Sequence, residues 1–164
     1  MCPVEYRYLG SAGELRVKSE FLDRGWNVAS AKVDFGDDIF AIRDSDAELS
    51  RIQVKTANVE GREYGYAAQF RVGKNQLHTF LEPPLDYVFT ARHESGWSPY
   101  VVIPQVELDE LVRSDGLGSD TETAYILAFR YHRGEEGIEK ILCSDSDLTE
   151  YKNDFSHWER IDHS

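Results

Sequence analysis

The chain has little cysteine and no long apolar run, with only two cysteines in 164 residues. Cys2 and Cys143 lie far apart, and neither has a neighbouring cysteine or histidine at zinc-ligand spacing. We therefore expect reduced thiols. No stretch reaches the roughly 18 apolar residues of a membrane span, and Glu5 and Arg7 lie where a signal peptide would be apolar. We expect a cytoplasmic protein with no membrane contact.

Several common enzyme signatures are also missing. The five histidines contain no H-x-x-x-H pair, which makes a zinc enzyme a poor match. Gly73 and Lys74 lack the earlier glycine and the following Ser or Thr of a phosphate-binding P-loop. The strand-to-helix elbow of a serine hydrolase is not found either.

Basic residues are scarce relative to acidic ones. The sequence has 30 acidic against 18 basic residues and a formal net charge of −12. This excess repels polyanions at long range, so a nucleic-acid function needs a local basic site or a metal-filled one. An acidic solvated surface, or adaptation to a high-salt cytoplasm, would explain the same composition. Length and 41% hydrophobic content predict one domain over residues 1–164.

The first part of the chain predicts a helix followed by three strands. Residues 11–24 form the helix, with an S-x-x-E capping box at Ser11 and Glu14. Apolar alternation and polar links then predict strands over residues 25–35, 37–44 and 51–57.

The second part predicts further strands and helices. Within residues 58–72 the aromatic residues are spaced loosely in the pattern of a strand. The best hairpin covers residues 85–104, with a turn at 94–98. Short helices are expected over residues 74–84 and 105–114, a loop over 116–123, and a strand or short buried segment over 124–132. From about residue 144 the tail is acidic, and Tyr151, Phe155 and Trp158 would dock it on the body. This order predicts a mixed α/β domain.

Four polar residues of the first helix and strand pair carry the strongest functional pattern. If residues 43–50 join antiparallel strands, Asp38 and Lys55 lie roughly 5–8 Å apart, with Gln53 on the face of Lys55. Glu14 lies in the middle of an apolar helix face, where a charge needs a partner. That face is formed by Leu15, Val17, Phe21 and Leu22. Oxygen atoms of Glu14, Asp38 and Gln53 would suit Mg²⁺ or Mn²⁺, and Lys55 would stabilise a phosphate.

Each of these residues also has a structural alternative. Glu14 fits helix capping, and Asp38 fits a turn-closing role after Gly36. Gln53 and Lys55 fit the solvated face of an edge strand. The register is assumed, and a slip of one residue would turn both side chains to the opposite face.

The same positions resemble the motifs of the PD-(D/E)xK nuclease superfamily. The matching segments are GELRVKSEFLDRGWNV, GDDIFAI and IQVKT, and the hairpin over residues 85–104 looks like later strands of its small bacterial uncharacterised members. Archaeal Holliday-junction resolvases are more distantly similar. The resemblance covers roughly two-thirds of the chain. It implies an α/β fold with a restriction-endonuclease-like αβββαβ core, in which a mixed central sheet is flanked by helices.

The resemblance also implies roles for individual residues. Asp38 matches the metal ligand, Lys55 the catalytic lysine, and Glu14 the helix carboxylate of the resolvase-like branch. Two positions depart from the pattern, because Asp37 replaces a proline and Gln53 replaces an acidic ligand. Glutamine is tolerated at this position in some active relatives.

We therefore expect a Mg²⁺-dependent DNA endonuclease that hydrolyses phosphodiester bonds with an activated water. Glu14, Asp38 and Gln53 would hold the metal, and Lys55 would orient water or stabilise charge. A catalytically silent module for nucleic-acid binding or protein interaction is the alternative. A homodimer is also expected from the resemblance, because two strands need two cuts, with the hairpin near Tyr87–Val102 as a possible contact edge.

Overall fold

The computed structural model describes residues 3–32 and 36–164. The end of the strand expected over residues 25–35 therefore lies outside the described residues, as does Cys2. The elements are α1 (Pro3–Asp23), β1 (Asn27–Ser30), β2 (Ile39–Arg43), β3 (Glu48–Arg62), β4 (Gly65–Gly73), α2 (Lys74–His78), β5 (Leu85–His93), β6 (Gly96–Trp97), β7 (Val101–Pro104), α3 (Gln105–Ser114), β8 (Ser119–Asp120), β9 (Ala124–Gly134), β10 (Gly137–Cys143), β11 (Ser146–Asp147) and a 3-10 turn, η1 (Thr149–Tyr151).

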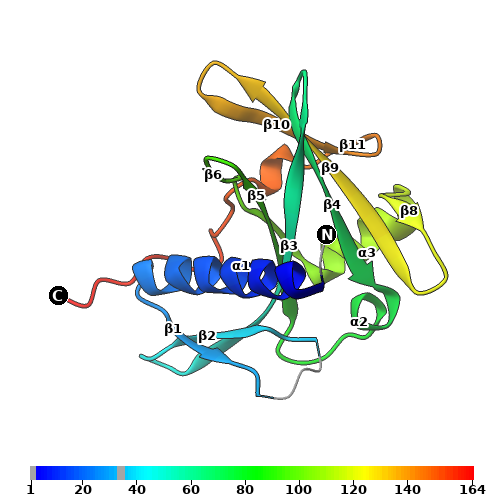
Figure 1. Ribbon diagram of the computed structural model, residues 1–164. Coiled ribbons are helices and arrows are strands. Elements are labelled where there is room, and N and C mark those ends of the chain that lie inside the picture. Colours follow the sequence, from blue (N-terminus) through cyan, green and yellow to red (C-terminus); the bar gives the residue numbers. More distant parts are fainter. Residues whose placement is uncertain (1–2, 33–35) are drawn as a thin grey trace.

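The long strand β3 organises the sheet (Figure 1). Its N-terminal part pairs antiparallel with β2, residues 51–58 pair parallel with β5, and residues 59–62 pair antiparallel with β4. Strand β5 continues to β7, while β4 continues through β9 to β10 and β11. Because β3 spans 15 residues, it joins two halves of one eleven-stranded sheet within the described chain.

The predicted fold class is wrong. The structure is 45% strand and 24% helix, and its strand pairs are antiparallel except for β3 with β5 among the described strands. It is therefore not an α/β restriction-endonuclease-like core with a mixed sheet flanked by helices. The physical reason is that β4, β9 and β10 extend the far half of β3 with antiparallel partners, so strands cover a face that the prediction gave to helices.

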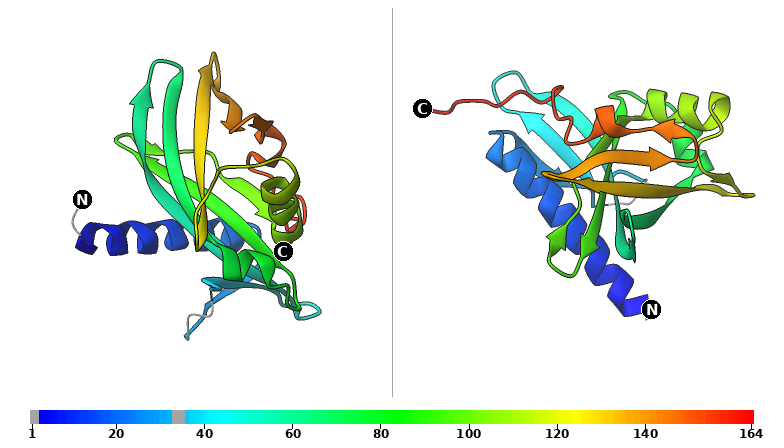
Figure 2. Two further views of the ribbon diagram at one scale, coloured as in Figure 1. Left: turned by 90° about the vertical axis from the view of Figure 1, so that its right-hand side faces the viewer. Right: turned by 90° about the horizontal axis from the view of Figure 1, so that it is seen from above.

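Two apolar clusters lie on opposite faces of the β3–β5 pair. Ile52 and Val54 pack with Val17 and Phe21 of α1, so α1 lies across this face (Figure 2). On the other face, Phe89 packs with residues of β4, β9 and α3, including Phe70, Leu108 and Phe129. Alternation of side chains along β3 and β5 produces this separation.

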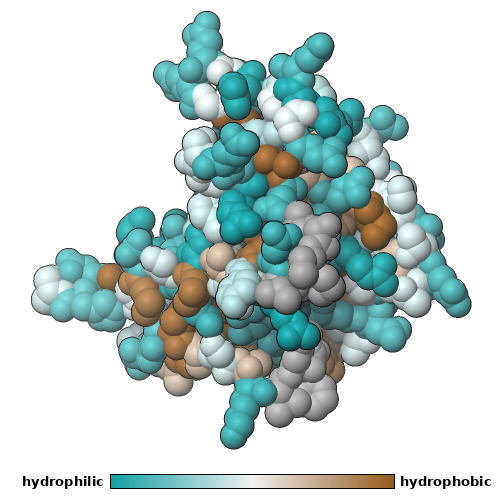
Figure 3. Space-filling view, viewed as in Figure 1, coloured by the Kyte–Doolittle hydropathy of each residue, from teal (hydrophilic) through white to brown (hydrophobic). Residues whose placement is uncertain are grey.

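Helix α1 differs from its prediction in both its start and its buried face. It begins at Pro3 rather than Ser11, a position where proline fits because the first helical N–H groups need no partner. The stripe that packs inward is Leu9, Gly13, Val17 and Phe21, while Leu15 and Leu22 are exposed. Figure 3 accordingly shows apolar surface over α1 on an otherwise largely hydrophilic face.

The last residues pack against the body of the protein. Phe155 and Trp158 are buried beside Phe21, and the Trp158 indole donates a hydrogen bond to Ser50 Oγ over 2.9 Å. Cys143 is a buried free thiol. Among the described helices, none combines the length and the apolar character that a membrane span requires.

Candidate functional site

The site lies just before β2 begins, where β3 continues past the first residue of β2. Ile39 pairs with Ile52, so the next step of this register places Asp38 opposite Gln53. The backbone N–H of Asp38 donates to Ile52 O over 2.9 Å, and the Asp38 carboxylate accepts the N–H of Val54 over 2.7 Å. Asp38 therefore satisfies with its side chain a backbone donor of β3 that lies beyond the start of β2.

A chain of hydrogen bonds ends at the Asp38 carboxylate, and each donor in it points toward that carboxylate. The Tyr87 hydroxyl donates to Gln76 Oε1 over 3.2 Å, and Gln76 Nε2 donates to Gln53 Oε1 over 2.8 Å. Gln53 Nε2 then donates to Asp38 Oδ2 over 2.5 Å. Burial raises the pKa of Tyr87, which keeps this hydroxyl protonated as the first donor. Aligned donors of this kind polarise one another toward the charge at the end of the chain.

Gly36 makes room for this network beside Asp38. Its φ is +95°, a left-handed conformation that glycine adopts without strain. A Cβ atom at this position would lie 2.2 Å from Gln76 Nε2, which donates to the Gly36 carbonyl. A glycine is therefore required here by both backbone conformation and close approach of the α2 side chain.

Asp37, the residue that departs from the nuclease motif, has a structural partner. Its two carboxylate oxygens accept hydrogen bonds from Arg51 Nε and Nη2 over 2.9 and 2.7 Å. The Arg51 guanidinium also donates to Pro83 O over 3.0 Å. Only 11% of the Arg51 side chain and 12% of the Asp37 side chain are exposed. Arg51 of β3 therefore joins the residues before β2 to the segment before β5.

Lys55 follows Gln53 on the same face of β3 and is half-buried. The sequence predicted that Asp38 and Lys55 would lie across from each other as direct or diagonal neighbours. The observed register puts Gln53 opposite Asp38, with Lys55 two positions further along β3 as the diagonal neighbour. A shift of two residues preserves the face of every side chain, because side-chain direction has a period of two. Gln53 and Lys55 therefore keep their predicted common face.

Glu14 is placed differently from its prediction. It lies half-buried at the side of the inward stripe of α1 rather than at its centre. The alternative of helix capping is also wrong, because α1 begins well before Ser11. Helix α1 packs on the Ile52 and Val54 face, opposite the face that carries Gln53. Within the described ranges, no hydrogen bond or ion pair connects Glu14 with Asp38 or Gln53.

A divalent cation at this site would need oxygen ligands from Asp38 and Gln53. Residues 3–32 and 36–164 contain no group of three or more His, Cys, Asp and Glu side chains arranged to hold a metal ion. Mg²⁺ often binds through one or two protein oxygens and keeps several waters, so Asp38 with one amide oxygen is a sufficient set. Gln53 presents its nitrogen to Asp38, however, and its oxygen accepts from Gln76. Coordination by Gln53 would therefore require its amide to turn over.

Three residues of the site were not predicted from the sequence. Gln76 and Tyr87 complete the hydrogen-bond chain, and Arg51 holds Asp37. Arg51 carried one usable signal, because a charged residue in a strand that is otherwise apolar needs a partner. Gln76 and Tyr87 reach the site through tertiary packing, and their local sequence contains no comparable signal.

Comparison of the chain with protein-family models, with curated proteins and with solved structures found no match. The functional assignment therefore depends on the geometry of Asp38, Gln53 and Lys55 and on the sequence motifs that contain them.

Proposed function

We propose that this chain is a divalent-metal-dependent endonuclease that hydrolyses a phosphodiester bond of DNA. The observation that supports it most is the contact of Asp38 with Gln53, with Lys55 following on the same face of β3. These are the residues through which the sequence resembles the PD-(D/E)xK nucleases. Because the overall fold is not the one that this resemblance implied, the proposal depends on the local arrangement alone.

Asp38, Gln53 and Lys55 each have a role in the proposed hydrolysis. Mg²⁺ or Mn²⁺ would be held by Asp38 and by the Gln53 oxygen after the amide turns over, and it would supply an activated water and charge stabilisation. The water oxygen would bond to phosphorus as the bond to the leaving sugar oxygen breaks, and the proton that the water loses would pass through solvent to that sugar oxygen. The Lys55 ammonium stabilises the negative charge that develops on the phosphate oxygens. Glu14 is left out because, among the described residues, no hydrogen bond or ion pair connects it with Asp38 or Gln53.

A catalytically silent module for nucleic-acid binding is the second candidate. The observation that favours it is the closed hydrogen-bond chain, in which Gln76 occupies the oxygen that Gln53 would offer to a cation. Such a chain also satisfies the Asp38 carboxylate without any metal. The same residues would then stabilise the start of β2 rather than perform chemistry.

A cleavage assay separates the two candidates. The purified protein is incubated with branched, nicked and plain DNA in Mg²⁺, in Mn²⁺ and in EDTA. Cleavage that requires the metal and disappears in Lys55→Ala supports the endonuclease. If no DNA is cut under any metal condition while the protein remains folded, the silent module is favoured.

A homodimer belongs to the same proposal, because cutting both strands of a duplex needs two active sites. The hairpin was expected to supply its contact edge, but β5 lies between β3 and β7 in the sheet. Among the described strands of the hairpin, β6 and β7 each pair only with β5 and can offer an edge, and Val101 of β7 already forms a bridge with Lys152. A monomer at high protein concentration, measured by analytical ultracentrifugation, would contradict the dimer.

A further inference from the structure

A large open cavity lies at the C-terminal ends of β3 and β5. Its volume is about 980 Å³, near the upper end of the range for ligand sites. Among the residues that line it are Tyr66, Arg92, His93, Trp97 and Arg133, and we call this cavity the arginine pocket. These side chains come from β4, β5, β6 and β9, so the sheet and one hairpin assemble it together.

The pocket concentrates positive charge on an acidic protein. Arg92 and Arg133 are exposed, and neither guanidinium has an ion-pair partner among the residues that the structure describes. Arg16 lies outside this lining, with its guanidinium 5.4 Å from the centre of the Trp97 ring and 3.8 Å from that of Tyr100. The one acidic residue of the lining is Glu94, which is exposed. Since the whole chain carries −12, this local excess of arginine is the opposite of its average surface.

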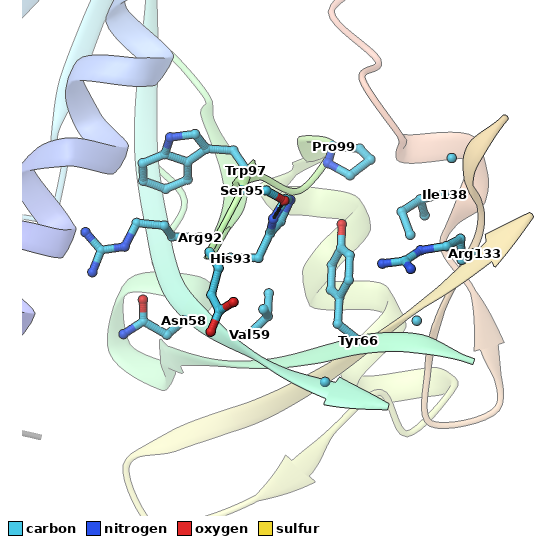
Figure 4. Close-up of a pocket in the computed structure, with 14 residues that line it drawn as sticks. Asn58, Val59, Tyr66, Arg92, His93, Ser95, Trp97, Pro99, Arg133 and Ile138 are labelled. Carbon is cyan, nitrogen blue, oxygen red and sulfur yellow. Dashed lines mark hydrogen bonds between the residues drawn. The ribbon is translucent and has the colours of Figure 1, made fainter. Parts of the chain in front are cut away.

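Aromatic rings lie between the two arginines. Figure 4 shows Arg92 and Trp97 on one side of the pocket, Tyr66 and Arg133 on the other, and His93 between them. The His93 and Tyr66 rings are 5.5 Å apart, and Tyr66 lies 4.9 Å from Tyr131, so this wall is a packed aromatic row. The indole of Trp97 is half-exposed and available to a planar ligand. A pocket with cations at both ends and rings between them suits a ligand that alternates phosphates and bases.

We infer that the arginine pocket binds a single-stranded nucleic-acid segment. Arg92 and Arg133 neutralise two of its phosphates, and Trp97 and His93 stack on its bases. A single strand fits better than a duplex, because only an unpaired base exposes its flat face to an aromatic ring.

This inference deepens the proposed function and rests on it for the substrate. Val59 of the pocket lies four residues after Lys55 on β3 and on the same face, a distance of about 13 Å at the rise of an extended strand. A strand held in the pocket would therefore continue toward the Asp38 site. An unpaired segment beside the cut would direct the enzyme to branched or nicked DNA rather than to plain duplex.

The test measures binding without cleavage. A fluorescent thymidine oligonucleotide, the corresponding duplex and free thymidine monophosphate are titrated in EDTA, and anisotropy or calorimetry gives the dissociation constants. We expect the single strand to bind more tightly than either of the others. The double variant Arg92→Ala/Arg133→Ala should weaken single-strand binding at least tenfold. It should also reduce the slope of log K against log salt by about 1.4, from about 0.7 for each phosphate contact.

Two further variants examine the aromatic and the steric requirement. Trp97→Ala should weaken single-strand binding roughly 5-fold to 150-fold, the range for loss of one stacked base. Gly61→Leu keeps all the charges and adds a bulky side chain to the lining, at a position where a Cβ meets no atom within 4 Å. The matched controls are Arg71→Ala, an exposed arginine of β4 outside the pocket, and Gly10→Leu, another position with open space around its Cβ. Both controls should bind like the parent protein.

Several outcomes would overturn the inference. These are binding to none of the three probes, equal loss in the controls, duplex binding as tight as single-strand binding, and monophosphate binding as tight as oligonucleotide binding. Parallel cleavage assays keep this inference separate from the proposed function. If the pocket variants cut DNA with metal as fast as the parent, the binding role of the pocket is rejected and the nuclease proposal stands. If the pocket variants lose binding but no variant cuts DNA, the nuclease proposal is rejected and the binding role of the pocket stands.

Discussion

The amide nitrogen of Gln53 lies 2.5 Å from Oδ2 of Asp38, and the amide oxygen faces Gln76. This orientation neutralises no charge, but it gives the Asp38 carboxylate a donor in the absence of a cation. It also means that the chemistry proposed for this site depends on which way one amide group points.

Replacing Gln53 with glutamate should tighten divalent-metal binding. A carboxylate brings a charge that an amide lacks, and it would lie beside Asp38 in a partly buried site where charges interact strongly. Without metal, the two carboxylates repel each other and should lower the melting temperature. Metal should therefore raise the melting temperature more in Gln53→Glu than in the parent, and calorimetry should show a lower dissociation constant for Mn²⁺.

The control for this variant is Gln69→Glu, which adds the same charge at an exposed position of β4. It should leave metal affinity and the metal-induced shift in melting temperature unchanged. If Gln53→Glu behaves like Gln69→Glu, no metal binds beside Gln53.

Replacing Lys55 with alanine should reduce the rate of DNA cleavage by orders of magnitude. Its ammonium is proposed to act on charge that develops in the transition state, so ground-state binding of DNA should change little. Single-turnover cleavage and anisotropy measure the two quantities separately. A variant that cuts as fast as the parent would remove Lys55 from the mechanism.

Replacing Asp37 with alanine should destabilise the fold without removing metal affinity. The change leaves the Arg51 guanidinium buried and uncompensated, which typically costs about 3 kcal/mol of unfolding free energy. Urea unfolding measures this loss, and the double variant Asp37→Ala/Arg51→Met should recover part of it.

The surface pair of Arg43 and Asp46 provides the comparison. Asp46 is 51% exposed, so Asp46→Ala should lower the unfolding free energy much less than Asp37→Ala does. Equal losses in Asp37→Ala and Asp46→Ala would show that burial of the Asp37 pair contributes nothing to stability.

Asp86 should make the protein less stable as the pH rises from about 4 to about 6. Burial, with Glu107 adding to it and His157 opposing it, raises the pKa of Asp86 from 3.8 to about 6. The folded state therefore holds a proton that the unfolded state has already released in this interval, so the free energy of unfolding falls with pH and is level above it. The contribution of this group is on the order of 2–3 kcal/mol.

The variant Asp86→Asn tests this assignment, because an amide does not ionise. Its melting temperature should exceed that of the parent at pH 7, and the fall between pH 4 and pH 6 should be smaller. Asp145→Asn, at an exposed position, should keep the parental pH profile. A parental profile in Asp86→Asn would assign the pH dependence to another group.

Local patterns predicted several elements correctly. Helix α3 covers the expected residues 105–114, and β5 pairs with β6 and β7 within the expected hairpin. Strand β9 contains the expected residues 124–132. These elements were predictable because periodicity and turn residues within a short window determine them.

Elements with distant partners were predicted poorly. Strand β3 is far longer than residues 51–57, because its second half pairs with β4, which the sequence indicated only loosely. Strand β10 was missed, because the exposed Glu139 and Lys140 interrupt its apolar residues at a register shift and its pairing with β9 defines it. In α1, apolar residues surround the helix, so the sequence did not distinguish the buried Leu9 from the exposed Leu15.

The sequence by itself determined that Asp38, Gln53 and Lys55 would gather on one side of a strand pair, because side-chain alternation survives a register shift of two residues. Only the tertiary structure decided what Gln53 does there. Its oxygen is occupied by Gln76 and its nitrogen by Asp38, and both contacts depend on how α2 and β5 pack beside β3. Hydrogen-bond partners separated by many residues are chosen by packing, which no local pattern in the chain encodes.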